Sequence, residues 1–189
     1  FLLASAPMHY CDYTATLPPD NPHRRYHDHE YGYPIAEDDR LFERLVFEIN
    51  QAGLSWTTIL NKADNLRRAY DHFAIERVAA YGEADIARLL ADAGIIRNRR
   101  KIAAAIHNAR VIRELQAAHG SFRAWLDAQV GADKATWVKL FKKTFAFTGP
   151  EITGEFLMSS GYLEGAHRRD CPVYTQILAA HPRWLTGGG

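Results

Sequence analysis

Apolar residues recur at helical spacing along nearly the whole chain, and no stretch shows the alternation typical of a strand. The spacing predicts helices over residues 39–52, 55–73, 83–93, 98–119, 121–129, 133–144, 150–161 and 173–180. The preceding segment contains Pro18, Pro19 and Pro22, so we expect it to be irregular. No repeat or low-complexity linker divides the chain, which therefore predicts one all-α domain over residues 1–189.

One acidic residue interrupts the apolar face of the helix predicted over residues 39–52. At about 100° per residue, Glu48 falls at the edge of the apolar arc, which is formed by Leu41, Phe42, Leu45, Val46, Ile49 and Ala52. A carboxylate at this position loses water, and the loss is costly unless another group pairs with it. We therefore expect Glu48 either to have a structural partner or to be free for a ligand.

The sequence from Leu89 to Arg110 predicts two helices joined by a short turn, in a hairpin that spans about residues 83–119. We expect Gly94 to end the first helix in the left-handed conformation. The second helix would then begin with unpaired N–H groups, which bind phosphate well. Basic residues crowd this helix start against the dipole preference for acids, namely Arg97, Arg99, Arg100 and Lys101. The pattern fits either a bound external anion or a solvated basic helix start.

Composition limits the classes of partner. The 189 residues are 47% hydrophobic, which supports a core, and the net charge of +1 offers no general attraction for a polyanion. Any nucleic-acid surface must therefore be local. No stretch is long and apolar enough to span a membrane, and the apolar opening at residues 1–4 is short for a signal peptide. We expect a cytoplasmic protein without a membrane partner.

Both cysteines of the chain can be paired with a histidine. Cys11 precedes His27 with fifteen residues between them, and His167 precedes Cys171 with three. Two thiolates and two imidazoles suit tetrahedral zinc in a closed, structural site. The alternative is one buried and one exposed free cysteine, with the histidines at the surface. A bound metal would join the segment at about residues 11–27 to the one at 167–171.

Taken together, these features resemble the 3-methyladenine DNA glycosylase I family. The resemblance rests on the segments Tyr26–Gly32, Gln51–Trp56 and Asp92–Ile102, and on the final His-x3-Cys pair. It extends from about Cys11 to Cys171 in the family's order and approximate spacing. The family belongs to the helix-hairpin-helix glycosylases, which are all-α, bilobal proteins that flip a damaged base into a pocket between their lobes.

The resemblance implies an activity and a role for each matching residue. The activity would be hydrolysis of the N-glycosidic bond of 3-methyladenine in double-stranded alkylated DNA, by a monomer, without strand cleavage. Glu48 would contact the extruded base as the catalytic acid residue, and Tyr26 and Trp56 would line its pocket. The ligands of one structural Zn²⁺ would be Cys11, His27, His167 and Cys171. The residues gripping the DNA backbone would be Gly94, Ile95, Ile96, Arg97, Arg99 and Lys101.

Several positions depart from the family's usual pattern. Tyr13 and Tyr31 stand where tryptophans are frequent, and His23 falls near a usual tyrosine. We expect Tyr13 and Tyr31 to stack on the base, and Tyr10 to be a core or surface aromatic. Two other functions stay open: a zinc-stapled DNA-binding module without catalysis, and a related glycosylase for other alkyl adducts. A second basic cluster fits a solvated helix face better than a phosphate grip; it comprises Lys139, Lys142 and Lys143.

Overall fold

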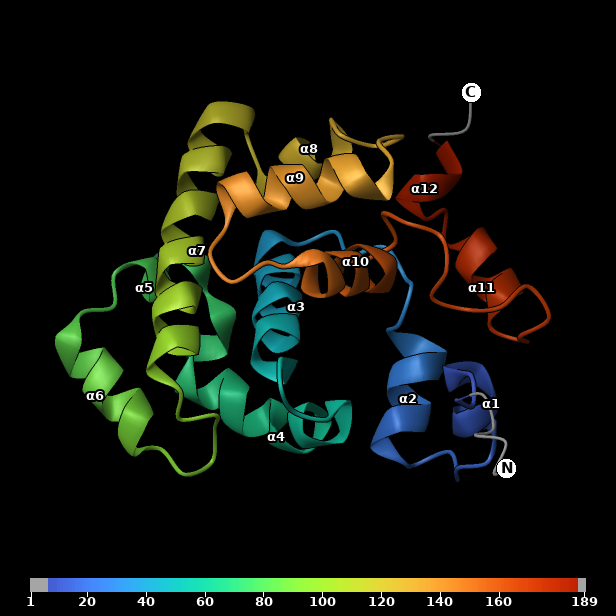
Figure 1. The fold of residues 1–189 in the computed structure, drawn as a ribbon, viewed down its shortest axis with the longest axis horizontal. Coiled ribbons are helices and arrows are strands. Elements are labelled where there is room, and N and C mark those ends of the chain that lie inside the picture. The colour runs from blue at the N-terminus through green and yellow to red at the C-terminus, as the bar shows by residue number, and fades with distance from the viewer. Residues whose placement is uncertain (1–6, 187–189) are drawn as a thin grey trace, which may run out of the picture.

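The computed structural model describes residues 7–186, which form helices and no strand (Figure 1). The all-α expectation is therefore confirmed. None of the helices in this range is long and apolar enough to cross a bilayer. The expectation for residues 1–4 lies outside the described residues. The helices are α1 (Tyr10–Ala15), α2 (Pro22–His29), α3 (Asp38–Gln51), α4 (Trp56–Ala69), the 3₁₀ turn η1 (Asp71–Phe73), α5 (Ile75–Ala79), α6 (Glu83–Ala91), α7 (Arg99–His119), α8 (Phe122–Asp127), α9 (Lys134–Thr144), α10 (Pro150–Ser159), α11 (Tyr174–Ala179) and α12 (Arg183–Thr186).

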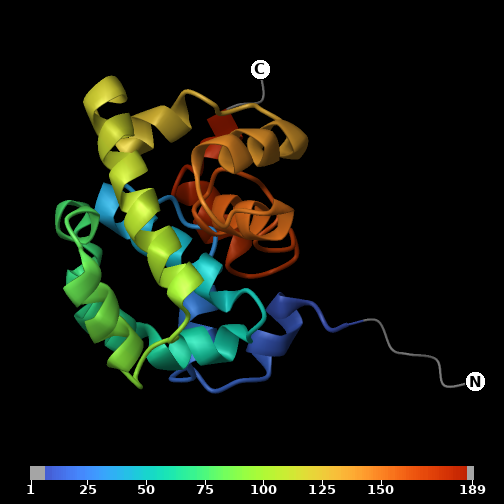
Figure 2. The same cartoon turned by 60° about the vertical axis from the view of Figure 1, so that its left-hand side comes forward.

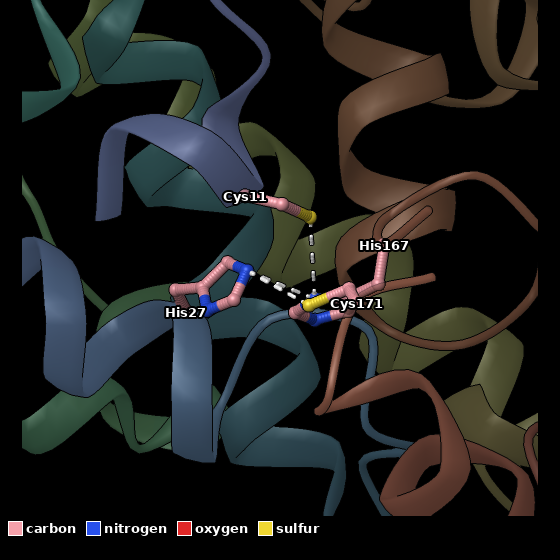
Figure 3. A group of neighbouring side chains, drawn as sticks. All are labelled: Cys11, His27, His167 and Cys171. Atoms are coloured by element: carbon pink, nitrogen blue, oxygen red, sulfur yellow. Dashed lines mark hydrogen bonds between the residues drawn. The ribbon is translucent and has the colours of Figure 1, made fainter. Parts of the chain in front are cut away.

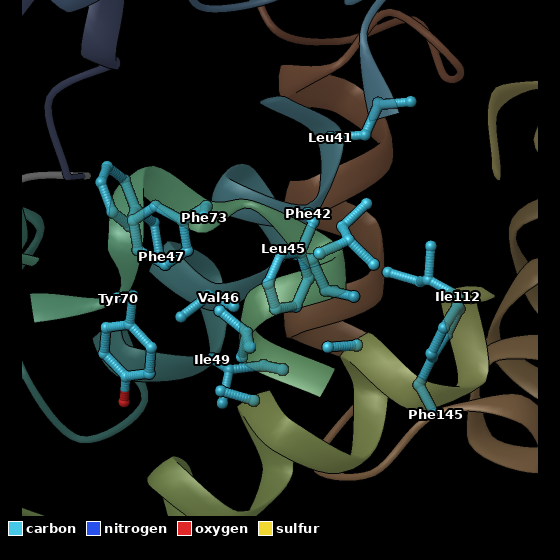
Figure 4. Close-up of a cluster of buried hydrophobic side chains, with 14 of the residues drawn as sticks. Leu41, Phe42, Leu45, Val46, Phe47, Ile49, Tyr70, Phe73, Ile112 and Phe145 are labelled. Atoms are coloured by element: carbon cyan, nitrogen blue, oxygen red, sulfur yellow. The ribbon is translucent and has the colours of Figure 1, made fainter. Parts of the chain in front are cut away.

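Helix α3 occupies the centre of the molecule, where α4, α7, α8 and α10 pack against it (Figures 1 and 2). Every residue from Leu41 to Asn50 is buried, so the helix is enclosed on all sides. Its apolar side chains meet Tyr70, Phe73, Ile112 and Phe145 in the main core (Figure 4). Because α3 has no solvent-facing side over this stretch, its charged residues also lie in the interior.

The N-terminal segment is more ordered than the prolines predict. Pro22 is the first residue of α2, a position where its missing N–H is not needed and its fixed φ suits a helix. The side chain of Asn21 caps the helix by accepting from the backbone N–H of His23. The expectation of an irregular segment is confirmed for residues 18–21, which form a turn, and is wrong for α1 and α2 on either side of it. Only Pro22 marks a helix start.

The helix predicted over residues 55–73 ends earlier, at Ala69. Asp71, His72 and Phe73 follow with φ values of 51°, 54° and 57°, which is the left-handed region. This turn buries Phe73 completely, against Tyr70 and Phe47. The reversal places α5 against α7, so that tertiary packing ends the helix before the apolar pattern does.

The predicted hairpin consists of α6 and α7, and the expected stripe of Ile102, Ala105, Ile106, Ala109 and Ile112 is buried. The expectation of a left-handed Gly94 was wrong. Asp92 ends α6 in an extended conformation, and its carboxylate accepts from the Gly94 N–H at 2.8 Å. A Cβ on Gly94 would lie 3.0 Å from Asn65 Nδ2 and from Asp92 Oδ1. Glycine is needed here because the turn packs closely on α4, not because φ is positive.

The two ends of the described chain meet on one side of the molecule. Helices α1 and α2 lie on the same side as α11 and α12, opposite α5 and α6 (Figure 1). A small apolar cluster joins these ends, separate from the main core; its buried members are Cys11, Cys171, Val173 and Ile177. Few apolar residues hold the ends together, and Arg168 adds an ion pair to Asp12 across the junction.

Candidate active site and metal centre

A cavity of about 1080 Å³ opens between helices α2 to α4 on one side and α10 on the other. Its walls include three tyrosines, a tryptophan and two carboxylates, which are Tyr10, Tyr26, Tyr31, Trp56, Glu48 and Glu155. The predicted residues Tyr26, Tyr31, Glu48 and Trp56 are thus brought together from α2, the loop after it, α3 and α4. A cavity of this size with aromatic walls and few polar groups is suited to a planar organic ligand.

The aromatic rings form a continuous wall. The centroid of Tyr26 lies 5.2 Å from that of Trp56 and 5.4 Å from that of Tyr31. Tyr10 meets Tyr31 edge to face at 5.7 Å. Ser55 caps α4 by accepting from the N–H of Thr58, which fixes the start of the helix that carries Trp56.

The structure corrects one of the predicted pocket residues. Tyr13 is not among the described residues that line the cavity. Its ring packs against Tyr10 and His23, and the residue is 39% exposed. Tyr10, three residues earlier on α1, lines the cavity instead. Its hydroxyl lies 2.9 Å from His23 Nδ1, and His23 Nε2 lies 2.7 Å from Thr57 Oγ1. His23 thereby ties Tyr10 to the residue next to Trp56. The adjacency of Tyr10 to Cys11 was the signal available in the sequence.

Glu48 is only 4% exposed and faces the cavity. Within residues 7–186 its carboxylate makes no hydrogen bond and no ion pair, whereas the other buried charges of α3 are paired. Glu43 accepts from Arg40 and Arg67, and Arg44 donates to the Ser159 carbonyl. Burial and, second to it, the charge of Glu155 raise the pKa of Glu48 from 4.5 to about 8, while Arg44 opposes the shift.

Glu155 was not predicted from the sequence, where α10 offers no motif. It reaches the cavity from α10, and the hydroxyl of Tyr31 donates to its Oε2 at 3.3 Å. Burial raises the pKa of Glu155, and the bond from Tyr31 partly offsets that rise. Of the three carboxylates that line the cavity, Glu151 is exposed, while Glu48 and Glu155 are withdrawn from solvent and come from helices far apart in the sequence.

Several hydrogen-bond donors also face the cavity. Burial raises the pKa values of Tyr26 and Tyr31 above their usual range, so both hydroxyls keep their protons at neutral pH. Trp56 also lines the cavity, but its indole Nε1 is inaccessible and has no hydrogen-bond partner within the described chain. An unpaired buried donor is unfavourable, so this group costs stability.

The four predicted metal ligands converge at the junction of the chain ends (Figure 3). One donor atom from each of Cys11, His27, His167 and Cys171 lies within 4.8 Å of the others. His167 Nδ1 lies 3.1 Å from His27 Nε2, 3.9 Å from Cys11 Sγ and 3.8 Å from Cys171 Sγ. Bond lengths of about 2.0–2.3 Å in a tetrahedral site place neighbouring donors roughly 3.3–3.8 Å apart. These residues can therefore hold a metal ion.

The surroundings of the two histidines also suit metal binding. His27 Nδ1 lies 2.7 Å from the carboxylate of Asp28, and His167 Nε2 donates to the Tyr31 carbonyl at 2.6 Å. Such bonds leave the opposite ring nitrogen as the free lone pair and orient it. Burial lowers the pKa of His167 to about 4, which keeps the ring neutral.

Each histidine or cysteine on the N-terminal side adjoins a tyrosine of the cavity. Cys11 follows Tyr10, and His27 follows Tyr26. His167 does not line the cavity itself, but it donates a hydrogen bond to the backbone carbonyl of Tyr31, which does. The metal centre and the aromatic wall are therefore two sides of the same N-terminal segment.

The hairpin residues have different surroundings. Arg97 and Arg99 are exposed, with Arg99 paired to Glu83 at 3.2 Å, and Ile95 is buried in the core. Lys101 corrects the prediction of a phosphate contact, because its side chain is only 5% exposed. Its Nζ donates to the carbonyls of Asn50 and Ala52 at 2.8 and 2.6 Å. Lys101 thus caps the C-terminus of α3. The second basic cluster on α9 is exposed; it comprises Lys139, Lys142 and Lys143.

Known proteins are similar to this chain in sequence and in fold. The methyladenine glycosylase family model matches residues 17–174. DNA-3-methyladenine glycosylase 1 of Escherichia coli (strain K12) is 34% identical over 168 residues, covering 79% of this chain and 89% of that protein. DNA-3-methyladenine glycosylase of Haemophilus influenzae is 30% identical over 169 residues, with 79% and 91% covered. A structure of 3-methyladenine DNA glycosylase I from Staphylococcus aureus superposes with a TM-score of 0.78 at 30% identity, covering 87% of this chain and 97% of that chain.

The matched region contains the greater part of the cavity. It includes α2, α3, α4 and α10, and with them Tyr26, Glu48, Trp56 and Glu155. It also includes the hairpin of α6 and α7. The sequence match, the shared fold and the cavity agree with the resemblance expected from the motifs, and the chain belongs to the methyladenine glycosylase family.

Proposed function

We propose that this protein is a DNA glycosylase that releases 3-methyladenine from alkylated double-stranded DNA. The observation that carries the proposal is the unpaired carboxylate of Glu48 at an aromatic cavity, in a helix whose other buried charges are paired. The names of the Escherichia coli and Haemophilus influenzae relatives support the same substrate.

Recognition would depend on the charge of the damaged base. Methylation at N3 makes adenine in DNA cationic, and an aromatic face attracts a cation by about 0.5–2 kcal/mol. The rings of Tyr26 and Trp56 would supply that attraction. A nearby positive charge favours the ionised form of Glu48, which then makes a charge-assisted hydrogen bond to the edge of the base. Normal adenine is neutral and gains neither interaction.

The base must leave the helix to reach this cavity. Extrusion costs a few kcal/mol and least for a damaged, poorly paired base. Phosphate contacts would offset that cost, and we propose that the hairpin supplies them through its backbone at Gly94, Ile95 and Ile96 and through Arg97 and Arg99. Arg97 and Arg99 are exposed at the start of α7, where a phosphate could reach them.

We propose that the reaction is hydrolysis by water and stops at the abasic site. The cationic base is already a good leaving group, so the enzyme needs less assistance to break its bond to the sugar. Glu48 would bind the base and stabilise positive charge that develops on the sugar. Among the described residues that line the cavity, the one lysine is Lys134, and it is exposed. We assign no nucleophilic role to this lysine, so strand cleavage at the abasic site should require added alkali.

We propose that the metal is one structural Zn²⁺ held by Cys11, His27, His167 and Cys171. All four ligands are protein side chains, which is the closed coordination typical of structural zinc. The ion would supply no chemistry to the reaction; it would hold the ends of the chain together. We expect the monomer to be active, because Tyr26, Glu48 and Trp56 of a single chain come together at the cavity.

The decisive experiment is release of free bases from methylated DNA. We expect the wild type to release 3-methyladenine, and Glu48→Gln to lower the rate at least about 100-fold, as for the loss of a group acting in the transition state. Trp56→Ala should also lower it, because a stacking face is lost. Glu76→Gln, the same change at an exposed position on α5, serves as the control.

The same assay separates the other functions. DNA binding without release of any base would identify a binding module and contradict the proposal. Release of bulkier alkylated bases, but not of 3-methyladenine, would identify a glycosylase of different specificity. A rate that is equal in wild type and Glu48→Gln would remove the role of Glu48.

A further inference from the structure

Two carboxylates face one cavity from opposite walls. Glu48 comes from α3 and Glu155 from α10, and these helices pack against each other. Neither side chain forms an ion pair within residues 7–186. The one hydrogen bond that Glu155 makes there is with the neutral phenol of Tyr31. Two acids placed together without a basic partner repel each other, so the arrangement costs stability unless a cation joins them.

Two basic side chains near the pair offset part of its charge without forming an ion pair with it in the described chain. Arg44 lies over the ring of Tyr26 at 5.1 Å, donates to the Ser159 carbonyl and to Glu30, and lowers the pKa of Glu48. Lys134 is exposed, lies beside Gly154 and lowers the pKa of Glu155. Every other ionisable side chain that lines the cavity is an acid or a tyrosine: Glu151, Tyr10, Tyr26 and Tyr31. The cavity is therefore short of positive charge at its centre.

We propose that Glu155 is a specificity-determining residue, which acts with Glu48 to select bases that carry a positive charge. The inference rests on the proposed function and deepens it by naming the property of the base that the cavity selects, which is its positive charge. The ligand class is a purine alkylated on a ring nitrogen, because such a base carries a cation delocalised over a flat ring. One carboxylate would suffice to hydrogen-bond the base; two make the cavity sensitive to its charge.

The charge of Glu155 has no evident use in the fold. Its bond to Tyr31 needs an acceptor oxygen, and the amide oxygen of glutamine offers one equally well. Glu155→Gln therefore keeps the hydrogen bond and the side-chain volume and removes only the negative charge. This makes the substitution a clean probe of electrostatic selection.

The pair also predicts a linked proton. Burial and the charge of Glu155 raise the pKa of Glu48 to about 8, so the empty cavity holds a proton near neutral pH. A cation that enters favours both carboxylates in their ionised form, and the proton leaves to solvent. In Glu155→Gln one source of the raised pKa is absent, so fewer protons should be released on binding.

The test compares two free ligands by calorimetry at about pH 7.5, where the pair is partly protonated. The 3,9-dimethyladeninium ion is a permanent cation whose 9-methyl group stands for the sugar carbon, and 3-methyladenine is the neutral counterpart. We expect Glu155→Gln to lower the affinity for the cation on the order of tenfold and the affinity for the neutral base less than about twofold. Glu155→Asp should retain more of the preference, and Glu76→Gln should change neither affinity. Buffers of different ionisation enthalpy should report less proton release for Glu155→Gln.

Three results would overturn the inference: no binding of the cation to the wild type, equal weakening of both ligands in Glu155→Gln, or unchanged affinities and proton release in that variant. The proposed function is judged separately by release of 3-methyladenine from DNA. If the wild type releases the base and Glu155→Gln still prefers the cation, only the inference about Glu155 is contradicted. If the wild type prefers the cation but releases no base, only the proposed function is contradicted.

Discussion

Three charged side chains of α3 lie in the interior, and their surroundings differ. Glu43 lies between Arg40 and Arg67, and Arg44 donates to a backbone carbonyl, so both are compensated for the loss of water. Glu48 has no such partner within the described chain and faces a cavity. A buried carboxylate with a raised pKa at a cavity is a candidate for ligand binding, and Glu48 is such a group.

The stability of the protein should report the buried Glu48 through its pH dependence. The pKa of Glu48 in the folded state is about 8, above the ordinary 4.5, so the folded protein holds a proton that the unfolded chain has lost. The stabilisation from the neutral acid is complete below about 4.5 and is lost as the pH rises through about 8.

We therefore expect the free energy of unfolding of the wild type, relative to Glu48→Gln, to fall over this range by up to about 1.4 kcal/mol per pH unit. Urea denaturation of both proteins at a series of pH values measures the difference. Parallel pH curves for the two proteins would show that Glu48 is solvated or paired in solution.

At the scale of elements, the start of α7 combines two functions that the sequence pattern does not separate. Three of its four basic residues are exposed and the fourth, Lys101, is buried. Arg97 and Arg99 are exposed, while Lys101 turns inward and caps the last carbonyls of α3. Cations stabilise a helix C-terminus, so Lys101 completes the end of the helix that carries Glu48. The cluster is therefore partly a structural cap and partly a candidate phosphate contact.

Substitution should separate these two functions. Lys101→Met removes two hydrogen bonds from a charged donor to buried carbonyls, so we expect the free energy of unfolding to fall by about 2–4 kcal/mol. Arg97→Ala should leave the free energy of unfolding within about 0.5 kcal/mol of the wild type. It should also reduce the slope of the logarithm of the DNA-binding constant against that of the salt concentration by about one, which corresponds to one phosphate contact. Chemical denaturation and DNA titrations at several salt concentrations provide the measurements. An unchanged stability for Lys101→Met would contradict its role as a cap.

At the scale of the molecule, the candidate metal centre lies where the two ends of the described chain meet, and it adjoins the cavity. Its side chains are far apart in the sequence: His27 and His167 are separated by 140 positions, and Cys11 and His167 by 156. The small apolar cluster at this junction is weak by comparison with the main core. Because Tyr10 and Tyr26 each precede a ligand, loss of the ion should loosen the aromatic wall as well as the ends.

Removal of one ligand tests this link. We expect His167→Asn to lose its zinc and to lower both 3-methyladenine release and the affinity for the free base by at least about tenfold, in line with the loss of a structural metal ligand. Proteolysis of the N-terminal segment should become faster. His119→Asn, at an exposed position at the end of α7, is the matched control. Full activity in a zinc-free His167→Asn protein would rule out the link between metal and cavity.

Local patterns in the sequence determined the helical class, the buried stripe of α7 and the anomaly of Glu48, because each follows from spacing along one helix. Residue chemistry suggested the Cys–His set, and the family resemblance favoured it over free cysteines. Only the tertiary structure decided which residues share the cavity. Tyr10 lines it instead of Tyr13, Glu155 joins it from α10, and Lys101 leaves the surface for the end of α3. The bond between Tyr31 and Glu155 spans 124 positions, and no periodicity encodes a contact at that distance. Packing of helices against α3 determines it, because the direction of each side chain depends on how its whole helix is oriented.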